Sequence, residues 1–262
     1  PAARDDENAA RTVRALAAME ASPPLRALCD AAAARGLPIL LDDTTLTIGT
    51  GVGAMSWAVE TLPPIDAVPW PSLHAVPSAL VTGSNGKTTT VRLLAAMCRA
   101  HGWPAAYSST DGVFFDGAAL EAGDFSGPTG ARTALRQVEA QAAILETARG
   151  GMLRRGLALG RADAAIVTNI SVDHFGEYGV HSVEDLAAVK LTVARAVAAS
   201  GWLVLNAEDP LLRRLGPDAA PRVAWFAVDH EALPEDAMSL PRCAVRDGSL
   251  LLDDGLETHD LG

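Results

Sequence analysis

The chain has 262 residues, enough for one large domain or two small ones, and it carries a formal net charge of −11. This acidity argues against non-specific binding to nucleic acid or to an anionic membrane surface. Its three scattered cysteines form no CxxC pair, and no apolar run approaches the roughly 18 residues of a membrane span, so we expect a cytoplasmic protein.

Residues 1–77 predict a small α+β region. Apolar residues at helical spacing predict two helices within residues 1–36, the second restarted by Ser22-Pro23-Pro24. Two short apolar runs, residues 38–41 and 46–48, predict a pair of strands.

The rest of this region is rich in glycine and proline. The Gly49–Gly53 stretch predicts a flexible turn, because it follows a strand but does not spell GxGxxG. Five prolines within residues 62–77 predict an extended linker, with a domain boundary near residue 77.

Residues 78–262 alternate between apolar strands and helices. Predicted strands are residues 79–82, 105–108, 142–145, 164–168, 202–205 and 223–228; predicted helices are residues 87–101, 130–138 and 182–199. Continuous apolar strands alternating with helices predict an α/β fold with a doubly wound, mostly parallel sheet. Residues 241–253 predict a closing hairpin around Asp247-Gly248.

A phosphate-binding loop is predicted where the first of these strands meets its helix. Residues 82–89 read TGSNGKTT, although Val81 departs from the generic GxxxxGK[ST] pattern. Backbone N–H groups at a helix N-terminus bind phosphate, a lysine reaches the terminal phosphates and the next hydroxyl ligates magnesium. The predicted ATP-binding residues are Gly83, Ser84, Asn85, Gly86, Lys87, Thr88 and Thr89.

Lysine is scarce in this chain. Lys87 and Lys190 are its only lysines, and the other basic residues among the 21 are arginines. A lysine that survives such a bias indicates a task that arginine cannot perform, such as acting as a compact charge or a deprotonatable amine.

Further blocks follow the loop in a fixed order. They are residues 109–112 (STDG), 123–128 (GDFSGP), 146–154 (ETARGGMLR), 169–176 (NISVDHFG) and 205–210 (LNAEDP). With the TGxNGKTT loop, they make the chain resemble the Mur ligase family, and in particular the C-terminal, Mur-ligase-like half of cyanophycin synthetases. The resemblance runs from residue 79 to about 228.

The resemblance implies an ATP-dependent, ADP-forming ligase that activates a carboxylate as an acyl phosphate and joins it to an amino-acid or peptide amine. It implies Lys87, His174 and Lys190 as catalytic residues. It also implies a magnesium site formed by Thr88, Glu146, His174 and Lys190, in which Asp173 orients His174. In many Mur ligases the lysine matching Lys190 is carbamylated, which requires a neutral amine that burial favours.

Other assignments rest on shorter motifs. Asn206 and Asp209 resemble the adenine-contacting segment of the family, but an Asn-Ala-Glu-Asp-Pro turn could equally cap a helix. We predict that three further residues face the acyl substrate: Thr110, Asp111 and Arg149.

The family's third, closing domain carries a His-Asn pair, and no such pair occurs in these 262 residues. We therefore expect that domain to be absent here, and we expect the chain to bind MgATP without ligating. A folylpolyglutamate-type ligase and a non-catalytic nucleotide-binding module remain alternatives, and a homo-oligomer remains open.

Overall fold

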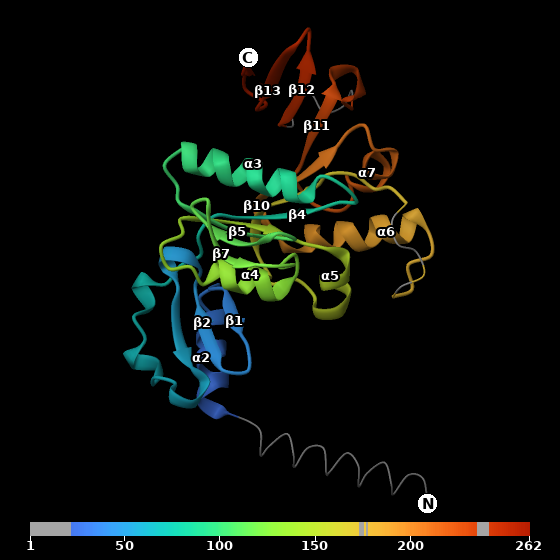
Figure 1. Cartoon of the computed structure of the whole chain (residues 1–262). Coiled ribbons are helices and arrows are strands. Elements are labelled where there is room, and N and C mark those ends of the chain that lie inside the picture. The colour runs from blue at the N-terminus through green and yellow to red at the C-terminus, as the bar shows by residue number, and fades with distance from the viewer. Residues whose placement is uncertain (1–21, 173–175, 177, 235–240) are drawn as a thin grey trace, which may run out of the picture.

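The computed structural model describes residues 22–172, 176, 178–234 and 241–262. A small antiparallel sheet of order β1-β2-β3 precedes an 11-stranded mixed sheet in the chain. Figure 1 shows helices on both faces of the large sheet and the small sheet below α4. The predicted first helix falls among residues 1–21, outside the described part. Among the described residues, no helix has both the length and the apolar character needed to cross a bilayer.

The N-terminal unit, residues 22–77, contains one α-helix, three strands and several short 3₁₀ turns. Its elements are α2 (Pro23–Ala33), β1 (Ile39–Leu41), β2 (Thr45–Ile48) and β3 (Met55–Ala58). Ser22 caps α2 by accepting a hydrogen bond from the Leu25 amide, with prolines at the first helical positions as predicted. Its core includes Leu28, Leu46 and Ile48.

Residues 62–77, predicted to be an extended linker, contribute Val68 and Leu73 to the N-terminal core, and the domain boundary near residue 77 stays a prediction. The prediction of a flexible turn over Gly49–Gly53 is wrong, because Gly51–Gly53 is a 3₁₀ turn in which both glycines are buried. A Cβ at Gly51 would overlap the Ala140 carbonyl oxygen, so this glycine permits close packing of two backbones.

The large sheet forms the centre of the molecule. Its strands, in spatial order, are β14 (Thr258–Asp260), β13 (Ser249–Asp253), β12 (Arg242–Arg246), β11 (Val223–Asp229), β10 (Val197–Asn206), β9 (Ala162–Val167), β4 (Ser78–Thr82), β8 (Ala142–Glu146), β5 (Ala105–Ser109), β6 (Gly112–Phe115) and β7 (Ala118–Ala122). Every neighbouring pair from β12 to β5 is parallel, and antiparallel hairpins extend both edges. The predicted doubly wound, mostly parallel sheet is therefore confirmed.

Helices cover the two faces unequally. The first, α3 (Lys87–Ala100), packs on β4, β8 and β5, where Val91 and Ala95 meet Ile144. Helices α4 (Pro128–Leu135), α5 (Arg149–Arg155) and α6 (Val183–Lys190) lie on the opposite face, and α7 (Pro210–Leu215) packs against α6 and β10. The chain reaches β5 through α3 and moves the other way to β9, β10 and β11 through α5, α6 and α7, so right-handed crossovers place these helices on opposite faces (Figure 1).

The predicted helix over residues 182–199 is wrong in its second half. α6 ends at Lys190, Leu191–Ala196 forms a 3₁₀ segment, and β10 already begins at Val197. Val197 pairs with Ala162 of β9, and the register shifts before Trp202. Tertiary pairing with β9 therefore overrides the helical tendency of this alanine-rich segment.

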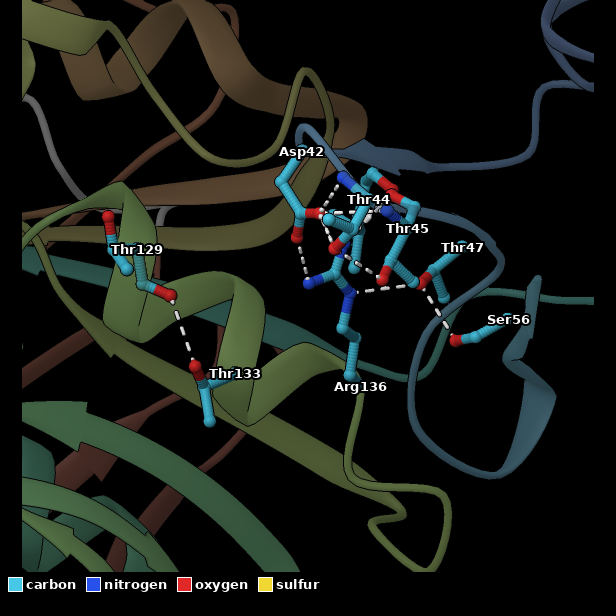
Figure 2. A network of polar contacts seen from close by, with 9 residues as sticks. Asp42, Thr44, Thr45, Thr47, Ser56, Thr129, Thr133 and Arg136 are labelled. Atoms are coloured by element: carbon cyan, nitrogen blue, oxygen red, sulfur yellow. Dashed lines mark hydrogen bonds and ion pairs between the residues drawn. The ribbon is translucent and has the colours of Figure 1, made fainter. Parts of the chain in front are cut away.

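Arg136, at the C-terminal end of α4, joins the N-terminal unit to the large sheet (Figure 2). Its guanidinium lies 2.5 Å from the Asp42 carboxylate and donates to the Thr47 hydroxyl at 2.9 Å. It also donates to the carbonyl oxygens of Leu40 and Thr45, at 3.4 and 3.3 Å. One side chain of the large domain thus reaches three segments of the N-terminal unit.

This contact predicts the titration of Asp42. The hydrogen bond from Arg136 is the main cause that holds the Asp42 pKa at about 2, below the ordinary 3.8, and the Thr44 and Thr45 amides assist. Since the folded-state pKa is lowered, the stabilisation is complete above pH 3.8 and is lost as the pH falls through about 2. Carboxyl-detected NMR should find the Asp42 pKa near 2 in the wild type and higher in Arg136→Met, where the Thr44 and Thr45 amides still lower it. An unshifted Asp42 in the wild type would contradict the contact.

Candidate nucleotide and acyl-substrate site

The candidate site lies where four neighbouring strands end. Strands β9, β4, β8 and β5 are adjacent and parallel, so their carboxyl ends meet along one edge of the sheet. The chain leaves β4 toward β5 on one side and leaves β8 toward β9 on the other. The edge is therefore a topological switch point, where open α/β sheets place their ligands.

The loop after β4 has the backbone conformation that its glycines permit. Gly83 has φ +146°, and Gly86, the N-cap of α3, has φ +83°. A Cβ on Gly83 would overlap the Thr168 hydroxyl, so only glycine fits against the end of β9. The N-cap of α3 provides no side-chain hydrogen bond, which leaves the first-turn N–H groups for an anion.

Residues that follow β9 hold this loop from the side. The Thr168 hydroxyl donates to the Asn85 carbonyl oxygen at 2.6 Å, and the Asn169 side chain accepts from the Asn85 amide at 3.0 Å. The Ser84 hydroxyl donates to the Ser171 carbonyl oxygen at 3.0 Å and accepts from the Ser171 amide at 2.9 Å. This reciprocal set fixes the loop shape without a ligand.

The two lysines of the chain meet at this loop. The Lys190 Nζ donates to the Gly83 carbonyl oxygen at 2.7 Å, and the Lys87 Nζ donates to the same oxygen at 3.1 Å and to that of Ser84 at 3.2 Å. The Lys190 side chain is only 2% exposed, although it lies at the end of α6. The fold thus brings Lys190 to a carbonyl group 107 positions before it in the chain, where it meets Lys87.

Glu146 lies beside the loop at the end of β8. One carboxylate oxygen, Oε2, accepts from the Thr88 hydroxyl at 2.9 Å and from the Thr110 amide at 3.3 Å. The other, Oε1, is buried and has no hydrogen-bond partner among the described residues. An unpartnered carboxylate oxygen buried next to a hydroxyl matches the hard-oxygen chemistry that Mg²⁺ requires.

No group of three or more His, Cys, Asp or Glu side chains suited to a metal ion occurs within the described ranges. Of the predicted magnesium ligands, Thr88 and Glu146 are in contact, and Lys190 reaches the same loop. His174 and Asp173 lie outside the described residues, so their predicted roles stay predictions.

A cleft of about 730 Å³ opens beside the loop, between α4 and α5. Its basic lining residues are Lys87, Lys190, Arg149, Arg154 and Arg155, and among the described residues that line it Asp124 alone is acidic. The Asp124 carboxylate accepts from the Ser126 amide and hydroxyl, at 3.1 and 2.7 Å, so it serves the local turn. The cleft therefore favours an anionic ligand.

The predicted substrate residues separate in the structure. Thr110 and Arg149 line the cleft. Asp111 instead forms an exposed ion pair with Arg92 of α3, at 2.5 Å. Arg154 and Arg155 were not assigned by the sequence, although Arg154 lies inside the motif ETARGGMLR that flagged this segment.

Asp209 caps a helix, which was one of the two alternatives. Its carboxylate accepts from the Leu211 and Leu212 amides at the start of α7 and from the Ile170 amide after β9. The Asn206 side chain donates to the Thr168 carbonyl oxygen at 3.1 Å and accepts from the Glu208 amide at 2.9 Å. Both side chains brace the loops at the site, and their adenine role stays a prediction.

Comparison with known proteins places this geometry in a family. A sequence model of the Mur ligase middle domain matches residues 81–242, more than half of the chain. The chain belongs to the Mur ligase family. The matched region contains the glycine loop, Glu146, the arginine-lined cleft and Lys190.

Individual relatives fall into two groups. The chain is 42% identical to a cyanophycin synthetase of Synechocystis sp. over 154 residues, covering 59% of this chain and 18% of that protein. It is 29% identical to a UDP-N-acetylmuramoyl-L-alanyl-D-glutamate–2,6-diaminopimelate ligase of Xanthomonas oryzae over 211 residues, covering 67% of this chain and 43% of that ligase. The Mur ligase chain thus spans less than half the length of these curated relatives.

Solved structures agree on the fold. A structure of UDP-N-acetylmuramoyl-L-alanyl-D-glutamate–2,6-diaminopimelate ligase has a TM-score of 0.53 at 19% identity, covering 71% of this chain and 39% of that one. E. coli FolC in complex with DHPP and ADP has a TM-score of 0.50 at 20% identity, covering 70% and 47%. These likenesses establish the Mur ligase fold and nothing finer.

Proposed function

We propose that this Mur ligase chain binds MgATP in an ADP-forming ligase that joins a carboxylate to an amino-acid or peptide amine through an acyl phosphate. The observation that carries the proposal is the contact of Glu146 with Thr88. A buried carboxylate with one unpartnered oxygen faces the hydroxyl that follows the loop lysine. An ordinary surface loop has no reason to bury such a group.

The nucleotide phosphates would lie on the first turn of α3, where the N–H groups have no side-chain cap. Lys87 would leave the carbonyl oxygens of Gly83 and Ser84 to meet the terminal phosphates, because a charged acceptor outcompetes a neutral carbonyl. Thr88 and Glu146 would hold magnesium, which when bound neutralises phosphate charge.

The cleft would hold the acyl substrate. Arg149, Arg154 and Arg155 would bind carboxylates by forked hydrogen bonds and would orient one carboxylate oxygen toward the γ-phosphorus. Attack by that oxygen forms the acyl phosphate and expels ADP. Attack by the amine on the acyl carbon then forms the amide and expels phosphate, while the amine gives up its proton.

The family relatives support this class of reaction. A cyanophycin synthetase and a 2,6-diaminopimelate ligase are both named among them. With the basic cleft, they favour an acidic peptide or poly-amino-acid carboxylate as acyl substrate and an amino acid as amine.

An ADP-release assay tests the proposal. The assay uses the ligase to which this chain contributes the MgATP site, because these 262 residues by themselves are expected to bind MgATP without ligating. That ligase with MgATP is supplied with triaspartate and each amino acid in turn, and ADP is measured with and without the amine. We expect ADP release that requires both substrates, with an amide product detected by mass spectrometry. Nucleotide binding with no substrate-dependent ADP release across the panel would instead indicate a non-catalytic binding module.

A further inference from the structure

Several hydrogen bonds between the N-terminal unit and the large domain involve one short stretch, residues 136–140. Arg136 reaches Asp42, Thr47 and two backbone carbonyl groups (Figure 2). Four residues on, the Ala140 carbonyl oxygen accepts from the Val52 amide at 2.9 Å, against the close-packed Gly51. This stretch connects α4 to β8, so the N-terminal unit holds both elements at one end.

The opposite ends of these two elements form the site. α4 begins at Pro128, and Gly127, Pro128, Thr129 and Gly130 line the cleft. β8 runs from the same held stretch to Glu146. α4 has eight residues, about 12 Å of helix, so movement at its held end is transmitted to its first turn.

The first turn of α4 is tightly fitted to the cleft wall. A Cβ on Gly130 would overlap the carbonyl oxygen of Phe125, which also lines the cleft. The Arg155 guanidinium donates to the Thr129 hydroxyl at 2.9 Å, which links α4 to α5. A shift of α4 would therefore displace both a wall of the cleft and one of its arginines.

We propose that Arg136 is a positioning residue for the acyl-substrate cleft. By fixing the C-terminal end of α4 on the N-terminal unit, Arg136 sets the place of the first turn of α4 and of Arg155 beyond it. The nucleotide loop has its own support, because residues after β9 hold it, so we expect it to be less affected by loss of this link. The assignment of the cleft to the acyl substrate rests on the proposed function; the mechanical link does not.

The test compares two matched variants. Arg136→Met removes the link, and Arg242→Met removes a similarly half-buried arginine–aspartate pair, Arg242 with Asp253 at 2.9 Å in the β12–β13 hairpin. In each variant, NMR follows exchange of the Ala131 amide, which donates to the Gly127 carbonyl oxygen in the first turn of α4. Calorimetry measures binding of MgADP and of triaspartate.

We expect Arg136→Met to speed Ala131 exchange and to weaken triaspartate binding, each by about tenfold, with MgADP affinity within about twofold of wild type. Arg242→Met should leave Ala131 exchange, triaspartate affinity and MgADP affinity unchanged. Each variant is measured at the same number of degrees below its own melting temperature. Equal Ala131 exchange in the two variants would overturn the proposal. It would mean that the loss of Arg136 loosens only the last turn of α4 and does not reach its first turn. If triaspartate fails to bind the wild type, the acyl-substrate assignment fails, and Ala131 exchange still decides the link.

Discussion

Replacing Lys87 with alanine is expected to weaken ATP binding by roughly 100-fold or more, beyond detection by calorimetry for a moderate wild-type affinity. Lys87 is one of two lysines at the loop, and its only hydrogen bonds within the described chain are to the carbonyl oxygens of Gly83 and Ser84. Losing these two hydrogen bonds to neutral carbonyl oxygens should cost the fold little stability. The phosphates, in contrast, would lose a positive charge beside the loop.

The matched control is Arg99→Ala, which removes a basic residue from the last turn of the same helix. Arg99→Ala should bind MgATP as the wild type does, and both variants should melt within a few degrees of it. Unchanged ATP affinity in Lys87→Ala would disprove the assignment of the phosphate loop.

Lys190→Arg is expected to lower substrate-dependent ADP release by about 100-fold or more. Lys190 is almost fully buried and touches the loop carbonyl of Gly83, so the larger, planar guanidinium does not fit the same space. Arginine also cannot be carbamylated, whereas a buried lysine can supply the neutral amine that reaction needs. The measurement is steady-state ADP release at saturating MgATP.

Arg195→Lys provides the opposite exchange at an exposed position five residues further on, and it should leave turnover unchanged. NMR of wild-type protein exposed to ¹³C-labelled bicarbonate tests carbamylation directly. Wild-type turnover in Lys190→Arg would refute the role of this lysine, whichever form of the side chain the spectra reveal.

The sequence predicted those elements of the fold that local chemistry determines. A glycine loop between an apolar strand and a helix predicted β4 and α3 within a residue or two, and the phosphate-binding role of the loop stays a prediction. The prediction of a helix over residues 191–199 was wrong because the alanines and valines there are compatible with a helix or a strand. The pairing of Val197 with Ala162 favours the strand. Gly201, where a Cβ would overlap the Asp163 carbonyl oxygen, shows how closely that pairing is built.

Local motifs also marked part of the candidate site. The loop motif pointed to Lys87 and Thr88, and the resemblance pointed to Glu146, which the structure places in contact with Thr88. The bracing roles of Thr168, Asn169 and Ser171 depend on contacts across more than 80 positions of chain, which no local pattern encodes. Arg136 has no motif at all, and its importance emerges only when the N-terminal unit is placed beside α4 (Figure 2).

The close-packed junction at Gly51 has a consequence for how this chain can be recombined with another. The backbone of Gly51 packs closely against the Ala140 carbonyl group. The Arg136 guanidinium adds hydrogen bonds to Leu40, Asp42 and Thr47 of the N-terminal unit. A chimaera that joins a foreign N-terminal unit at the prolines before residue 78 would keep residues 136–140 of this chain. Those residues fit the original N-terminal unit and not the foreign one. A chimaera that exchanges residues 22–77 should therefore also exchange residues 136–140, which contact them.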